Sequence, residues 1–120
     1  FIGHANGWWA SVSGDCTAKD MGSYPKAPVT PGGAVDRLFD AYPNIFGDLS
    51  AGSGCNAITR DKQWGREFLI RRADRLMFGT DYLGIGQNIP QFDALKEFAL
   101  PADVQEKICR KTAEKVLRGG

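Results

Sequence analysis

Two short apolar runs with a helical pattern between them constrain the fold of this chain more than any other feature. Residues 44–50 and 75–79 each hold a few apolar side chains and run into polar residues. The runs begin about 30 residues apart, which is the size of a strand–helix–strand unit with parallel strands and a right-handed crossover. Their uniformly apolar character predicts a sheet without a solvated face. We therefore expect an α/β protein.

Helices are expected between and after these strands, packed on one side of the sheet. Apolar residues recur at helical spacing from Val35 to Tyr42, and Pro43 ends that pattern. Further helices are predicted over residues 56–73, around residues 92–98, and from Pro101 to about residue 117. Residues 1–3 have the character of a strand end. Glycine and proline are frequent in residues 10–32, so this stretch is predicted to form a mobile loop over the site.

Length and composition exclude several classes of protein. A chain of 120 residues is enough for one small domain. Lys and Arg number 15 against 14 Asp and Glu, so we expect no nucleic-acid partner. No apolar stretch is long enough for a membrane span, and no signal peptide is visible. Cys16, Cys55 and Cys109 form no paired motif, so we interpret them as free thiols and expect a reducing, cytoplasmic location.

Polar residues follow the predicted strands at the ends where parallel α/β proteins carry their chemistry. His4 follows the first strand, Asp48 and Ser50 close the second, and Asp81 follows the third. A histidine and an aspartate at one rim can bind a divalent metal, and a carboxylate beside a metal-bound water can take its proton.

Structural roles are open for the same residues. His4 can be a hydrogen-bonded structural histidine, Asp81 can cap a turn, and Asp48 can bond a backbone amide, which is the role we favour for it. Trp8 and Trp9 are either core residues or a wall of the substrate site. Our candidate substrate-binding residues are Trp8, Trp9 and Tyr82, the last of which is next to Asp81 in sequence.

These motifs resemble the amidohydrolase-related metal-dependent hydrolases, including the branch of the aminocarboxymuconate-semialdehyde decarboxylases. Residues 75–82 (RLMFGTDY) are similar to the last barrel strand of that family and are the most specific part. Residues 1–7 (FIGHANG) resemble the sixth strand and residues 42–50 (YPNIFGDLS) the seventh. Residues 100–113 resemble the closing helix.

The resemblance implies a TIM-like (β/α)8 barrel, of which residues 1–120 would be a partial domain holding about strands six to eight. It implies a divalent metal, zinc foremost, with His4 and Asp81 as metal ligands and catalytic residues. The implied reaction is hydrolysis of amide, ester or lactone bonds of a small molecule by a metal-activated water. Non-oxidative decarboxylation on the same barrel is the alternative, and a non-catalytic α/β binding module is a second one.

One departure from the family pattern concerns the metal ligands. The chain has a single histidine, so the His-x-His pair of the first barrel strand and the histidine of the fifth are absent. We therefore expect the N-terminal half of the barrel to be missing here and to be this chain's partner. A homo-oligomer is left open, and no membrane partner is expected.

Overall fold

Three short parallel strands form one sheet in the computed structural model, which describes residues 1–119. They are β1 (Ile2–Gly3), β2 (Phe46–Asp48) and β3 (Leu76–Met77), hydrogen-bonded in the order β1-β2-β3. Gly47 stands opposite Gly3 on one side and Leu76 on the other. The predicted parallel α/β arrangement is confirmed, and the carboxyl ends of all three strands share one edge of the sheet.

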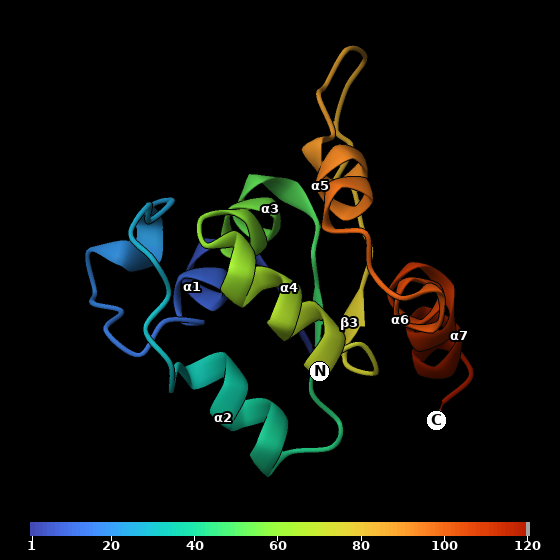
Figure 1. Ribbon diagram of the computed structural model, residues 1–120, viewed down its shortest axis with the longest axis horizontal. Coiled ribbons are helices and arrows are strands. Elements are labelled where there is room, and N and C mark those ends of the chain that lie inside the picture. Colours follow the sequence, from blue (N-terminus) through green and yellow to red (C-terminus); the bar gives the residue numbers. More distant parts are fainter. Residues whose placement is uncertain (120) are drawn as a thin grey trace.

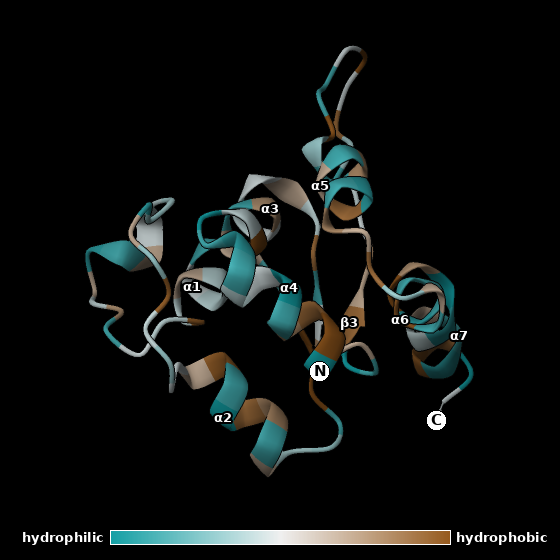
Figure 2. Cartoon of the chain, in the orientation of Figure 1, coloured by the Kyte–Doolittle hydropathy of each residue, from teal (hydrophilic) through white to brown (hydrophobic). Residues whose placement is uncertain are grey.

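Helices connect and surround the strands (Figure 1). They are α1 (Ala5–Ala10), the 3-10 turn η1 (Asp20–Gly22), α2 (Ala34–Ala41), α3 (Ala51–Thr59), α4 (Lys62–Arg71), α5 (Pro90–Phe98), α6 (Ala102–Glu106), the π-helical η2 (Lys107–Lys111) and α7 (Thr112–Leu117). Figure 2 shows apolar β3 in brown between helices whose visible surfaces are largely teal. Amphipathic helices therefore cover the sheet and turn their polar sides to solvent.

Aromatic rings fill the space between the sheet and the helices. Trp9 and Phe68 meet edge to face at 6.5 Å, and Phe68 stacks on Trp64 at 4.6 Å. Glycines make room for the indoles, because a Cβ at Gly3 would lie 2.1 Å from the Trp8 ring and one at Gly47 would lie 3.1 Å from Trp9. Such offset and edge-on pairs add about 0.5–1.5 kcal/mol each beyond the burial of their surface.

The C-terminal helix covers the outer edge of β3. The Met77 carbonyl accepts from the Leu49 amide, so the backbone groups of the next residue point away from β2. There the Phe78 amide donates to the Ile108 carbonyl at 2.8 Å, within π-helical η2. Thr112 donates to the Ala73 carbonyl at 2.9 Å. These contacts lay the helix antiparallel to β3 and satisfy edge groups that would otherwise attract another strand.

Several elements differ from the sequence prediction. Helix α1 was not expected, and α3 begins at Ala51, before the start of the helix predicted over residues 56–73. The single helix predicted over residues 56–73 is two helices, because Asp61 caps α4 by accepting from the Trp64 amide at 3.1 Å. Residues 11–33 are irregular apart from η1, and buried Val12 and Val29 tie both parts of this loop to the core.

Two remaining features concern the surface and the cysteines. The segment between β3 and α5 extends away from the rest of the molecule, and Leu83 and Ile85 in it are almost fully exposed. No helix within residues 1–119 combines the length and the apolar character needed to cross a membrane. All three cysteines are free thiols, as expected, with Cys55 buried and Cys109 exposed.

Candidate active site

His4, Asp48 and Ser50 meet at the carboxyl ends of β1 and β2. The Nδ1 atom of His4 lies 3.2 and 3.1 Å from the two carboxylate oxygens of Asp48 and 3.2 Å from the Ser50 hydroxyl. Ser50 in turn donates its backbone amide, at 3.0 Å, and its hydroxyl to Asp48 Oδ1. The side chain of His4 is 42% exposed and that of Asp48 27%. The cluster is therefore open to solvent and held by a partly buried carboxylate.

The pairing of His4 with Asp48 follows from the strand order. Strand β2 adjoins β1, so residues at their ends are neighbours although they are 44 positions apart in sequence. Trp9 fixes the end of β2 by donating its indole N–H to the Asp48 carbonyl at 2.9 Å. Gly79, beyond β3, leaves space for the cluster, because a Cβ there would lie 2.9 Å from Ser50 Cβ. All three strands thus contribute to its geometry.

The hydrogen bonds to Nδ1 leave the other ring nitrogen of His4, Nε2, available to accept a proton or bind a metal. With Asp48 ionised, the hydrogen bond places a proton on Nδ1, so the neutral ring carries its lone pair on Nε2. A carboxylate hydrogen-bonded to Nδ1 fixes the orientation and the tautomer of the ring, as behind metal-bound histidines. Nε2 can therefore accept a proton or bind a metal.

Asp81 lies at the same edge of the sheet but apart from this cluster. It follows the end of β3 and is exposed, with a left-handed backbone at φ 50°. Within residues 1–119 no hydrogen bond or ion pair joins its carboxylate to His4; its carbonyl accepts from Gln87 at 2.9 Å. Because β2 separates the two outer strands, their ends lie about 9–10 Å apart at ordinary strand spacing. The structure brings Asp48, rather than Asp81, to His4.

The three candidate substrate-binding residues occupy different environments. Trp9 is 1% exposed and packs in the core. Trp8 is partly buried and, together with His4, lines an apolar groove of about 410 Å³ between β1, α1 and α2. Tyr82 is 55% exposed in the segment between β3 and α5. Of the three candidates, Trp8 is the one that shares a surface with His4.

Gln91 is a site-supporting residue that the sequence did not reveal. It is 1% exposed, and its amide nitrogen donates to the carbonyls of Leu49 and Ala51 at 3.0 and 2.6 Å. These bonds hold the turn that carries Ser50. A glutamine at the start of an amphipathic helix is expected at the surface, so no local sequence pattern could have identified Gln91 as a buried supporting residue.

The metal expected from the resemblance needs more ligands than this arrangement supplies. Nowhere in the described stretch 1–119 do three or more His, Cys, Asp or Glu side chains gather as a metal ion would require. Catalytic zinc takes three protein ligands and a water. The residues present therefore do not form a metal site on their own.

Comparison with known proteins identifies the family. A family model described as amidohydrolase matches residues 25–119, which include Asp48, Ser50 and Asp81, while His4 precedes the match. Comparisons with curated proteins and with solved structures gave no match. Because the matching model spans most of the chain, this protein belongs to the amidohydrolase family.

Proposed function

We propose that this chain forms part of a metal-dependent hydrolase that cleaves amide, ester or lactone bonds of a small molecule. Family membership supports the general reaction class. The observation that carries the proposal is the carboxylate–histidine–serine cluster at the carboxyl edge of a parallel sheet. That edge is where α/β proteins place their reacting groups.

In this proposal His4 is the residue that moves a proton or binds the metal through Nε2. Asp48 and Ser50 act as positioning residues, because both contact Nδ1 and not the outward nitrogen. Asp81 is the second metal ligand or general base at the same rim. A positioned general base contributes about 10²–10⁴-fold to a proton-transfer step.

The remaining ligands would come from the N-terminal half of the barrel, with this chain supplying about strands six to eight. The free edge of β1 supports this arrangement. The Phe1 carbonyl accepts from Phe46, so the backbone groups of Ile2 point outward, where residues 1–119 offer no further strand. The apolar groove beside β1 is lined by side chains that a neighbouring strand and helix could cover.

The tautomer of His4 tests this arrangement directly. His4 is the chain's sole histidine, so its ring signals in nitrogen-15 NMR spectra are unambiguous. With the ring neutral, we expect the Nδ1–H form to dominate in the unmodified chain. In Asp48→Ala the Nε2–H form, usual for free histidine, should take over. Asp81→Ala is the control and should leave the tautomer as it is. A ring that carries Nε2–H in the unmodified chain would refute the proposed orientation.

Activity tests the reaction itself, in the polypeptide that carries the other barrel strands. A panel of amides, esters, lactones and carboxylic acids separates hydrolysis from carbon dioxide release. His4→Ala should lower kcat by about 100-fold or more. Asp48→Asn should lower kcat less and leave KM nearly unchanged, because Asp48 does not face the outward nitrogen. Carbon dioxide release without hydrolysis would favour the decarboxylase, and binding without turnover the non-catalytic module.

A further inference from the structure

Helix α5 buries a polar side chain at a position of its apolar face. Its buried residues lie at the spacing of one helical face and are Gln91, Ala94, Leu95 and Phe98. Gln91 is 1% exposed, although an amide removed from water costs free energy unless it is hydrogen-bonded. A leucine would fill the same position without that cost. The amide of Gln91 therefore needs partners, and they lie on a different segment of the chain.

The Gln91 amide nitrogen bonds to both sides of one residue in the turn after β2. It donates to the carbonyls of Leu49 and Ala51, which flank Ser50 in sequence. An amide NH₂ group has two donors, so these two bonds use its full capacity. Ala51 has a left-handed backbone at φ 60°, which a residue with a Cβ keeps only where its surroundings enforce it. Gln91 therefore holds the turn in place around Ser50.

Ser50 transmits this constraint to the candidate active site. Its amide and its hydroxyl both donate to Asp48 Oδ1, and its hydroxyl lies 3.2 Å from His4 Nδ1. A change in the turn therefore moves two of the donors that orient the Asp48 carboxylate. That carboxylate is the group that keeps a proton on Nδ1 of the neutral His4 ring. Contacts thus run without interruption from Gln91 through Ser50 and Asp48 to His4.

We propose that Gln91 is a positioning residue that sets the tautomer of His4 by holding Ser50 against Asp48. This role rests on the proposed function, in which Nδ1 of His4 carries the proton and the outward Nε2 acts. Gln91 lies in the first turn of α5, directly after the segment that joins β3 to α5. The state of the histidine therefore depends on how α5 docks against the loop after β2.

Nitrogen-15 NMR of the His4 ring, with the ring neutral, measures the effect in the 120-residue chain. Gln91→Leu keeps an apolar side chain on the buried face of α5 and removes both donors. We expect it to lower the ratio of the Nδ1–H form to the Nε2–H form by about threefold or more. Ser50→Ala should lower the ratio as well. The double variant should show less than the product of the two single effects, because Gln91 acts through Ser50.

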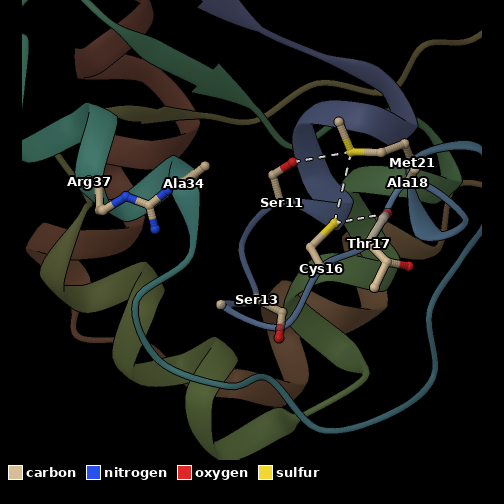
Figure 3. A pocket seen from close by; sticks show the side chains of 9 residues that line it. Ser11, Ser13, Cys16, Thr17, Ala18, Met21, Ala34 and Arg37 are labelled. Carbon is tan, nitrogen blue, oxygen red and sulfur yellow. Dashed lines mark hydrogen bonds between the residues drawn. The ribbon is translucent and has the colours of Figure 1, made fainter.

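Two variants control for the loss of a buried polar side chain as such. Thr112 is 3% exposed and donates to the Ala73 carbonyl, which precedes the amino end of β3. Ser13 is also 3% exposed and lines a separate cavity between the end of α1 and the start of α2 (Figure 3). Its hydroxyl accepts from the Thr30 amide at 2.8 Å. Thr112→Val and Ser13→Ala should lower stability and leave the tautomer ratio unchanged.

An unchanged ratio in Gln91→Leu, when the unmodified chain carries Nδ1–H, would overturn the proposal and leave Gln91 a purely structural residue. Equal shifts in Gln91→Leu and Thr112→Val would overturn it too, because the ratio would then follow stability. An unmodified chain that carries Nε2–H would instead refute the orientation of His4 in the proposed function. Circular dichroism verifies folding, and Gln91→Met, which is unbranched and of similar length, replaces Gln91→Leu if leucine unfolds the chain.

Discussion

Backbone strain gathers at the carboxyl ends of the strands. Ala5, directly after His4, has φ 70°, Ala51, directly after Ser50, has φ 60°, and Asp81 has φ 50°. Residues with a Cβ rarely adopt this left-handed conformation, which costs about 1–2 kcal/mol each. Strain of this kind collects at functional sites, where the surrounding structure over-determines the backbone. Here it lies directly after His4 and Ser50 and at Asp81 itself.

Replacing Ala51 by glycine should release part of this strain. Glycine adopts φ 60° without a Cβ clash, so we expect Ala51→Gly to raise the free energy of unfolding by up to about 1 kcal/mol. Ala57→Gly, in the interior of α3, is the matched control and should lower it by about 1 kcal/mol. Chemical denaturation measures both. A loss of stability in Ala51→Gly would mean that the turn is not strained.

Asp61 joins two separate segments through one carboxylate. Its Oδ1 caps α4, and its Oδ2 accepts from the Val29 amide at 3.2 Å. Asp61→Ala should lower the free energy of unfolding by about 1–2 kcal/mol, the usual cost of losing a cap. Asp74→Ala removes an exposed ion pair with Lys107 and should cost about 0.5 kcal/mol or less. Equal effects in the two variants would contradict the capping role.

At the scale of elements, α3 and α4 approach each other at a glycine. A Cβ at Gly65 would lie 1.9 Å from the Ile58 carbonyl oxygen, which is backbone and cannot rotate away. Gly65→Ala should therefore lower the free energy of unfolding by about 2–3 kcal/mol. Gly22→Ala, with no atom within 4 Å of its Cβ position, should change it little. Thermal unfolding compares them, and similar melting temperatures would argue against the close approach.

The strands, α2 and the C-terminal helix could be predicted because their apolar periodicity is local. Helix α1 could not, since Asn6 and Gly7 disfavour a helix and packing of Trp8 and Trp9 supplies its stability. The break between α3 and α4 depends on the cap at Asp61, which tertiary structure selects from several polar residues.

The sequence predicted which polar residues lie at the ends of strands, but not which of them contact one another. His4 follows β1, Asp48 closes β2 and Asp81 follows β3, as expected, but which of them meet depends on strand order. The preference for Asp48 as a residue bonding a backbone amide is matched by its bond to the Ser50 amide. Its contact with His4 joins residues 44 apart and required the order β1-β2-β3. Sequence periodicity carries no information on that order.

At the scale of the whole molecule, the two edges of the sheet differ in how far they are covered by other elements. The C-terminal helix covers the β3 edge through the Phe78–Ile108 hydrogen bond. The β1 edge faces the groove beside α1 and α2, and Phe1 and Ile2 there are 79% and 46% exposed. The radius of gyration, 13.5 Å, is that of a compact chain of this length. The molecule is therefore closed at one edge and open at the other.

This asymmetry, together with the number of ligands, predicts how the chain responds to zinc. His4 and Asp81 are the candidate ligands, and β2 stands between them. A catalytic zinc site needs a third protein ligand, so we expect no tight zinc binding by the 120-residue chain in calorimetric titration.

Addition of a polypeptide that pairs along the β1 edge and brings further histidines should create the zinc site. Zinc binding should then depend on Asp81, because loss of one ligand from a site with three protein ligands weakens it strongly. We expect Asp81→Ala to abolish tight binding in that assembly, while Asp40→Ala, an exposed carboxylate paired with Arg72, leaves it intact. One tightly bound zinc per 120-residue chain, lost in His4→Ala, would instead mean that this chain holds a complete metal site.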